Sequence, residues 1–373
     1  MKPLGLYVHI PFCARKCPYC DFYSLVSTPD MQEAYTRAVL AHMKRMPDGL
    51  IADTLYFGGG TPILMKPELL GQIVECAQQK FHLSGEIALE ANPCATTLPI
   101  LEQLHACGFN RISFGMQSAV EAELRILGRQ HTPEQVAQAI TWAKQAGFTN
   151  LSVDIMLDVP QQTRDSLDST LDFIQALEIQ HVSAYLLKIE PHTAFDCDAI
   201  RAQVPDEDLA ADLYLHTVHR LASMGFAQYE ISNFAKLGAE SRHNLKYWHA
   251  EEYLGFGPSA HGFWQGERYD YPRDLNAYIA SAGQNRLLEQ RQTSTSALEE
   301  AIMLGLRLTE GVEWASLEQR FGLDTTRMRR LASQYTQYGL MKQEHGQASL
   351  TPNGFLVSNS ILAEFLSLVD GGE

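Results

Sequence analysis

Short apolar runs alternate with longer segments of helical periodicity over the first half of the chain. Six runs have the pattern of buried strands, at residues 4–10, 54–57, 86–91, 111–116, 151–157 and 181–187. Five segments between them place apolar residues at helical spacing, at 31–46, 67–81, 97–107, 133–147 and 163–177. Strands that alternate with helices predict an α/β fold with a parallel sheet. We expect a partial (β/α)6 TIM-like barrel rather than a doubly wound sheet.

The alternation of strands and helices fades after Pro205. One helical pattern covers 207–224, and the segment 229–271 is rich in glycine and aromatic residues, which we interpret as part of a site. From Thr295 the pattern is helical, with one strand-like run at 348–350. We therefore predict a barrel (1–205), an extension (206–294) and a small, mainly helical, winged-helix-like domain (295–373), with a polar linker at 291–296.

The composition is that of an ordinary folded protein, with 45% hydrophobic and 20% charged residues. The net charge of −15 argues against a nucleic-acid partner, because such binders carry a basic surface. No apolar stretch reaches the roughly 18 residues of a membrane-spanning helix, and the start of the chain lacks a secretory signal pattern. We expect a cytoplasmic protein, and the sequence leaves open peripheral membrane association and the choice between a monomer and a homodimer.

Three of the seven cysteines crowd into one loop after the first predicted strand. Cys13, Cys17 and Cys20 are separated by three and then two residues, a spacing at which thiolates can hold a cubane iron-sulfur cluster. Three protein ligands leave one iron open for a further ligand. The alternatives are a zinc site with His9 as the fourth ligand, or reduced structural thiols.

Polar residues and a glycine-rich turn follow the predicted strands. Gly58, Gly59 and Gly60 come directly after the second strand, where their backbone can approach a ligand closely. Glu90, Gln117 and Asp154 lie at or near the ends of the next three strands. In a β/α barrel the ligands bind at the carboxyl ends of the strands. Any one of these residues alone is better explained as a cap or a solvated side chain, but together they favour a binding site.

The cysteine loop, with Tyr19 before its last cysteine, resembles that of the radical S-adenosylmethionine (SAM) superfamily. The resemblance implies that the open iron of a 4Fe-4S cluster chelates the amino and carboxylate groups of SAM. It also implies that an injected electron cleaves SAM to a 5′-deoxyadenosyl radical.

Four further blocks resemble the oxygen-independent coproporphyrinogen III oxidase-like family: YVHIPFC (7–13), YFGGGTP (56–62), EANP (90–93) and SFGMQS (113–118). The resemblance extends over essentially the whole chain. It implies that SAM is contacted by Tyr7, Tyr19, Gly59, Gly60, Thr61, Glu90, Gln117, Arg129 and Asp154. Arg129 has the least local context, and without the family it reads equally well as a surface arginine.

Within this family the sequence is more similar to the heme-chaperone branch than to the true oxidases. The oxidases carry a further cysteine two positions after the cluster loop, where this chain has Phe22, and an extension before the first strand. The block at 243–248 resembles the HNxxYW motif that is associated with heme binding in the chaperones.

The motif is chemically suited to heme. His243 offers an imidazole to the iron, and Tyr247 and Trp248 offer flat apolar surface to the macrocycle. Competing iron ligands are His249, His261 and the Tyr247 phenolate, and a packing role for His243 is the other alternative.

The resulting hypothesis is a heme chaperone that binds SAM and a 4Fe-4S cluster and delivers heme to apo forms of heme-dependent respiratory enzymes, with a small protein as electron donor. The alternative is an oxidase that decarboxylates two propionates of coproporphyrinogen III, and a third possibility is a zinc-stabilised binding module. Whether the chain cleaves SAM as an enzyme is left open.

One departure from the family is Asp158, where relatives usually have glycine. This residue either alters the loop near the SAM ribose or replaces one turn by another.

Overall fold

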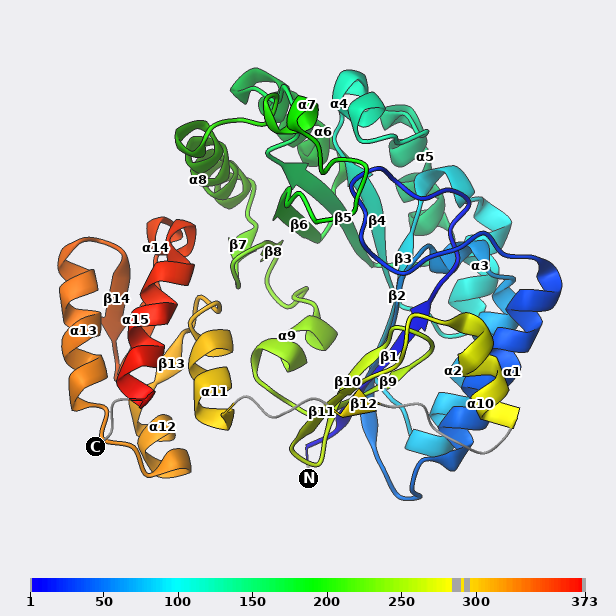
Figure 1. The fold of residues 1–373 in the computed structure, drawn as a ribbon. Helices are drawn as coiled ribbons and strands as arrows, with labels where there is room; N and C mark the ends of the chain where they lie inside the picture. The colour runs from blue at the N-terminus through cyan, green and yellow to red at the C-terminus, as the bar shows by residue number, and fades with distance from the viewer. Residues whose placement is uncertain (1, 284–289, 292–295, 371–373) are drawn as a thin grey trace.

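The structure is a computed structural model that describes residues 2–283, 290–291 and 296–370. Most of the predicted linker at 291–296, and with it the predicted boundary between 294 and 295, lies outside these residues. The described part consists of a curved sheet with helices on its outer side and a smaller, mainly helical part beside it (Figure 1).

Six parallel strands in sequence order form the centre of the sheet. They are β1 (Leu4–Ile10), β2 (Ala52–Gly59), β3 (Glu86–Ala91), β4 (Arg111–Gln117), β5 (Asn150–Leu157) and β6 (His181–Leu186). β1 is buried at six of its seven positions, as expected for a strand covered on both faces. The predicted partial (β/α)6 barrel is confirmed.

The connecting helices cover the outer face of the sheet (Figure 1). They are α1 (Pro29–Arg45), α2 (Pro67–Phe81), α3 (Leu98–Ala106), α5 (Pro133–Gln145) and α6 (Arg164–Leu177). Thr132 and Thr163 cap α5 and α6 by accepting hydrogen bonds from the backbone of the first turn. The pattern did not predict the short helices η1 (Pro62–Leu64), η2 (Pro93–Ala95) and α4 (Glu121–Ile126).

Short strands from the extension lengthen the sheet at both edges, so that it has twelve strands. Beside β1 lie β9 (Tyr253–Phe256), which is parallel to it, and then the antiparallel strands β10 (His261–Trp264), β11 (Glu267–Asp270) and β12 (Gln290–Arg291). Beside β6 lie the antiparallel strands β8 (Asn233–Ala235) and β7 (Ala227–Gln228). The extension thus completes the sheet of the barrel, which its glycine and aromatic content did not predict.

The described residues of the extension also contribute the helices α8 (Glu207–Ser223), α9 (Arg242–Trp248) and α10 (Leu275–Gly283), and the short helix α7 (Asp198–Arg201) lies just before the extension. α8 packs on α6 outside the barrel, and α9 lies on the inner side of the sheet against β2 (Figure 1). α9 carries the HNxxYW block, so this segment is held inside the barrel.

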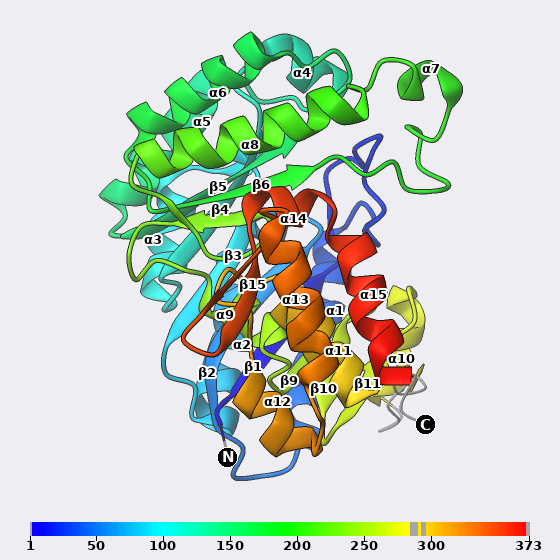
Figure 2. The ribbon, with the colours of Figure 1, turned by 90° about the vertical axis from the view of Figure 1, so that its left-hand side faces the viewer.

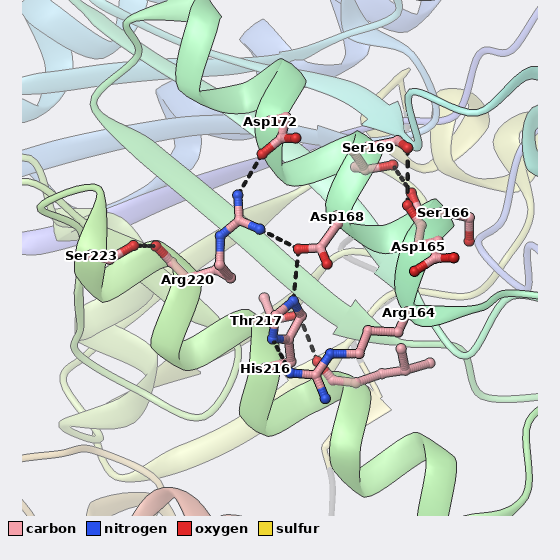
Figure 3. Close-up of polar contacts among 12 residues, drawn as sticks. Arg164, Asp165, Ser166, Asp168, Ser169, Asp172, His216, Thr217, Arg220 and Ser223 are labelled. Atoms are coloured by element: carbon pink, nitrogen blue, oxygen red, sulfur yellow. Dashed lines mark hydrogen bonds and ion pairs between the residues drawn. The ribbon is translucent and has the colours of Figure 1, made fainter.

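Ion pairs join α8 to α6 (Figure 3). The Asp168 carboxylate accepts hydrogen bonds from His216, at 2.7 Å, and from Arg220. Arg220 also pairs with Asp172 at 2.5 Å, and Arg164 with Asp212 at 3.0 Å. These partly exposed pairs hold the first helix of the extension to the barrel.

The C-terminal part is mainly helical, as predicted, with α11 (Ala297–Gly305), α12 (Trp314–Phe321), α13 (Thr326–Gln337), α14 (Pro352–Leu356) and α15 (Ser358–Asp370). The strand expected at 348–350 forms within β15 (Gln347–Leu350). β15 pairs with β14 (Met341–Glu344) and with β13 (Val312–Glu313), two strands that the sequence did not predict. This part lies where the two edges of the large sheet face each other (Figure 2). Among the described residues no helix is long and apolar enough to cross a membrane.

Candidate functional site

A cavity of about 430 Å³ opens at the carboxyl ends of the parallel strands. Its wall contains all three cysteines of the predicted cluster loop and eight of the nine predicted SAM residues: Cys13, Cys17, Cys20, Tyr19, Gly59, Gly60, Thr61, Glu90, Gln117, Arg129 and Asp154. Tyr7 is not part of the wall. Its ring lies behind the cavity, stacked on the ring of Tyr56 at a centroid distance of 6.4 Å.

The cysteine loop runs from the end of β1 over the carboxyl ends of the neighbouring strands and is the dark-blue loop of Figure 1. The Cys13 thiol lies 3.4 Å from the Thr61 hydroxyl, which ties this loop to the glycine-rich turn after β2. The Phe195 amide donates to the Pro18 carbonyl oxygen at 3.1 Å, so the segment after β6 supports the middle of the loop. Burial raises the pKa of the Cys20 thiol.

His9 is not turned toward the cysteines. Its side chain is buried, and its ring nitrogens are hydrogen-bonded to the Tyr7 hydroxyl at 3.0 Å and to the Tyr23 carbonyl oxygen at 3.1 Å. In the part of the chain that the structure describes, no three His, Cys, Asp or Glu side chains are grouped so as to hold one metal ion. The zinc alternative with His9 as a ligand therefore has no preformed site.

Arg129 brings a guanidinium to the cavity wall. Its guanidinium lies 5.9 Å from the centre of the Tyr19 ring, and its buried Nε has no hydrogen-bond partner. A side chain at Gly115 would come within 3.3 Å of Arg129 Nη2, so the absence of one leaves the guanidinium accessible. A partly buried guanidinium on the wall of a cavity suits an anionic group such as a carboxylate.

Two partly buried carboxylates, Glu90 and Asp154, give another part of the wall the opposite charge. Glu90 accepts hydrogen bonds from the Tyr56 hydroxyl at 2.9 Å and the Gly59 amide at 3.2 Å, and Asp154 accepts one from the Ser113 hydroxyl at 2.9 Å. Burial and the neighbouring Asp154 raise the pKa of Glu90 to about 7, and burial raises the pKa of Asp154. A cationic ligand would restore the ionised form of this pair, so the wall is suited to an ammonium or sulfonium group.

None of the three predicted heme residues lines the cavity. The His243 side chain is fully buried, and its ring nitrogens are hydrogen-bonded to the Thr54 hydroxyl at 2.8 Å and the Tyr247 hydroxyl at 2.7 Å. An iron atom would reach either nitrogen only after one of these partners moves. Heme binding by His243, Tyr247 and Trp248 stays a prediction.

Further residues of the wall were missed by the sequence analysis. Besides Tyr56 and Asn244, they include Arg111, Ser152, His181, Ser183 and Tyr185. Several occupy alternate positions on β5 and β6, which is the period at which side chains of a strand share one face. Polar residues at every second position of otherwise apolar strands were the sequence signal that could have identified these wall residues.

Asp158 does not line the cavity. It follows β5 with a φ of 62°, in the left-handed region that glycine adopts without strain. Its Oδ1 atom is buried and has no hydrogen-bond partner. Aspartate therefore occupies a backbone position suited to glycine, and an effect of Asp158 on the loop near the SAM ribose stays a prediction.

Comparison with known proteins gives both a family and a fold. The model of the radical SAM superfamily matches residues 7–174, and that of the HemN C-terminal domain matches residues 292–357. The chain is 32% identical over 373 residues to the heme chaperone HemW of Lactococcus lactis subsp. lactis (strain IL1403), with 98% of each chain covered. It is also 32% identical over 375 residues to the heme chaperone HemW of Bacillus subtilis (strain 168), with 96% of this chain and 98% of the relative covered.

Among solved structures, the coproporphyrinogen III oxidase HemN from Escherichia coli matches with a TM-score of 0.83 and 22% identity over 97% of this chain and 89% of that chain. This likeness shows a shared fold. The identity to the chaperones over nearly the full length of both chains shows the family. The chain therefore belongs to the HemW heme chaperone family of the radical SAM superfamily.

Proposed function

We propose that this chain is a heme chaperone that binds a 4Fe-4S cluster and SAM in the cavity above β1 to β6. The observation that carries the proposal is the single cavity wall that brings three cysteines together with Arg129 and the Glu90–Asp154 pair. The three thiols suit a cluster better than a single ion, because each would bind a different iron and they are not grouped around one point.

The remaining donors of the wall match the polar groups of SAM. Arg129 would bind the carboxylate through its guanidinium, and Glu90 with Asp154 would accept from cationic or hydroxyl groups. When bound, the cluster supplies an open iron and single electrons; the chain's own residues orient SAM and exclude water from it. We infer a small protein as the electron donor.

The cargo is proposed to be heme, with transfer to heme-dependent respiratory enzymes. Two observations support a chaperone over an oxidase. Two relatives that match over nearly the full chain, from Lactococcus lactis and Bacillus subtilis, are named heme chaperones. By the family resemblance, Phe22 stands where the oxidases carry a further cysteine. Phe22 is exposed at the cavity, and its phenyl ring has no donor atom that could replace a thiolate as a ligand of iron.

The first test separates the chaperone from the oxidase. The anaerobically reconstituted protein is incubated with SAM, reductant and coproporphyrinogen III, with a known oxidase alongside, and the porphyrins are resolved by mass spectrometry. We expect no decarboxylation by this chain. Loss of two carboxyl groups would identify it as an oxidase despite Phe22.

The second test asks for heme binding directly. The reconstituted protein is titrated with heme and the Soret band is followed. We expect a saturable spectral change with retention of heme after gel filtration. Failure of the cluster-loaded protein to retain heme would overturn the chaperone proposal.

A further inference from the structure

The helix that carries the HNxxYW block is built into the inner wall of the barrel. His243, fully buried, uses Nδ1 with the Thr54 hydroxyl of β2 and Nε2 with the Tyr247 hydroxyl of its own helix. Burial lowers the pKa of His243 to about 3, so the ring is neutral and has one donor and one acceptor for these two partners. Both nitrogens of the ring are therefore in use within the fold.

The flat face of the same ring supports a tyrosine that reaches the cavity. The His243 ring is stacked on the ring of Tyr56, with a centroid distance of 5.3 Å and an angle of 18°. The Tyr56 hydroxyl donates to Glu90 Oε1 at 2.9 Å. Two contacts therefore lead from α9 to the carboxylate in the SAM cavity, and the neighbouring Asn244 lines that cavity itself.

We propose that His243 is a positioning residue for SAM, which holds the ring of Tyr56 so that its hydroxyl orients the Glu90 carboxylate, and that it is not the ligand of the heme iron. The inference rests on the proposed SAM site. It assigns His243 of the HNxxYW block to the binding of the cofactor rather than of the cargo.

The ionised Glu90 carboxylate depends on the hydrogen bond from Tyr56 because few other groups stabilise its charge. Apart from Tyr56, Glu90 has the Gly59 amide at 3.2 Å, while Asp154 of β5 repels its charge. The phenols of Tyr7 on β1 and Tyr247 on α9 also face it. Without the bond from Tyr56 the carboxyl group would hold its proton to higher pH, and SAM would lose an ionised partner.

The experiment compares His243→Ala with wild type in the full-length, anaerobically reconstituted protein. SAM affinity is measured by equilibrium dialysis and heme affinity by titration. We expect SAM affinity to fall about tenfold, the effect of one hydrogen bond to a charged group, and heme affinity to stay within about twofold. Weaker heme binding with unchanged SAM affinity would overturn the inference and make His243 the heme ligand.

Two further variants separate positioning from a loss of folding. His243→Phe keeps a ring against Tyr56, so we expect it to retain SAM affinity within about threefold and heme affinity unchanged; loss of heme binding in this variant would also overturn the inference. Tyr56→Phe removes only the hydroxyl, and we expect the same loss for SAM as in His243→Ala. In the double variant His243→Ala/Tyr56→Phe the two losses of SAM affinity should not add, because both changes act through the same hydrogen bond from Tyr56 to Glu90.

The matched control is His42→Ala. His42 is also a buried histidine with both ring nitrogens bonded, to Tyr278 at 2.8 Å and Tyr271 at 3.1 Å, but it lies on α1 away from the cavity wall. We expect no change in SAM affinity. An equal loss in this control would show general loosening and refute a specific role for His243.

The pH dependence of SAM affinity distinguishes a positioning role for His243 from a general loosening of the fold. Because loss of the Tyr56 bond raises the pKa of Glu90, the deficit in SAM affinity of His243→Ala should be larger at pH 6.5 than at pH 8.5. An equal deficit at both pH values would contradict the inference. Absence of SAM binding in the wild type would instead overturn the proposed function itself.

Discussion

Asp158 is an acidic residue at a backbone position suited to glycine. The residue has a φ of 62°, and its Oδ1 is buried without a partner. Burial raises the pKa of the carboxyl group from 3.8 to about 6. At neutral pH the folded chain therefore holds a charge that would be better solvated in the unfolded chain, and we expect both Asp158→Asn and Asp158→Gly to stabilise the fold.

The size of the effect follows from that shift. A change from 3.8 to about 6 corresponds to ~3 kcal/mol when the carboxyl is ionised. Because the side chain is only half-buried, solvent screening reduces this, and we expect ~1–2 kcal/mol at pH 8 for Asp158→Asn. The destabilisation by Asp158 is absent below its unfolded pKa of 3.8. It grows as the pH rises toward the folded pKa of about 6, and it is complete above about pH 7.

Asp158→Gly tests the cost of the left-handed backbone conformation separately from the cost of the charge. Asn tolerates the left-handed region nearly as well as Asp, so Asp158→Asn changes mainly the charge. Asp158→Gly also removes about 1 kcal/mol of conformational strain, offset by ~0.5–1 kcal/mol from the greater freedom of glycine in the unfolded chain. The two variants should therefore differ by less than about 1 kcal/mol.

The assay is urea unfolding of both variants and wild type at pH 5 and pH 8, followed by circular dichroism with the same cofactor load. The gain for Asp158→Asn at pH 5 should be about half of that at pH 8, since pH 5 lies between the two pKa values. Glu102→Gln, at an exposed position of α3, is the matched control for removal of one acidic side chain, and we expect it to change the free energy of unfolding by less than about 0.5 kcal/mol at either pH. An Asp158→Asn gain that is the same at both pH values, or a loss, would refute a buried and unpaired carboxylate.

Three further predictions concern the cluster, the SAM site and the outer helices. Serine at any one of the three loop cysteines should abolish iron and sulfide binding, while Cys197→Ser, at an exposed position, should keep both; iron and sulfide analysis after reconstitution checks this. Glu90→Gln should weaken SAM binding at least about tenfold at pH 8 by equilibrium dialysis, and an unchanged affinity would place the cationic group of SAM elsewhere. Asp168→Asn should cost about 0.5–1 kcal/mol in urea unfolding at pH 7. Its hydrogen bond from His216 lowers the pKa of Asp168, so the contribution is present above the unfolded pKa of 3.8 and is lost as the pH falls through the folded pKa; an equal cost at pH 3 would contradict the ion pair.

The barrel could be predicted because its strands and helices carry strong local signals. β1 to β6 are buried runs of six to eight residues, and proline or threonine marks the start of most connecting helices. The edge strands carry no such signal. β9 has four residues and includes Gly255, and its pairing with β1 joins positions almost 250 residues apart. A choice of partner at that distance is decided by tertiary packing rather than by local pattern.

The grouping of the candidate residues in one cavity was also largely predictable, for a topological reason. Once the strands are parallel and in order, their carboxyl ends must meet, and residues such as Glu90 and Asp154 are brought together from distant positions. Arg129 came only from the family resemblance. Its context is the short segment between α4 and α5, which brings the guanidinium next to Tyr19 on the cluster loop.

The HNxxYW block shows where residue type alone fails to decide between functions. An imidazole beside two aromatic side chains suits both a heme ligand and a buried hydrogen-bonded packing unit. The structure supplies Thr54 and Tyr56, 189 and 187 positions earlier in the chain, as the partners of His243. If the ring left them to bind iron, Tyr56 would lose its support, and heme and SAM would weaken each other's binding, since such coupling is reciprocal. If His243 stays in place, the two ligands bind independently of this ring, so the sign of their coupling in wild-type protein distinguishes the two roles.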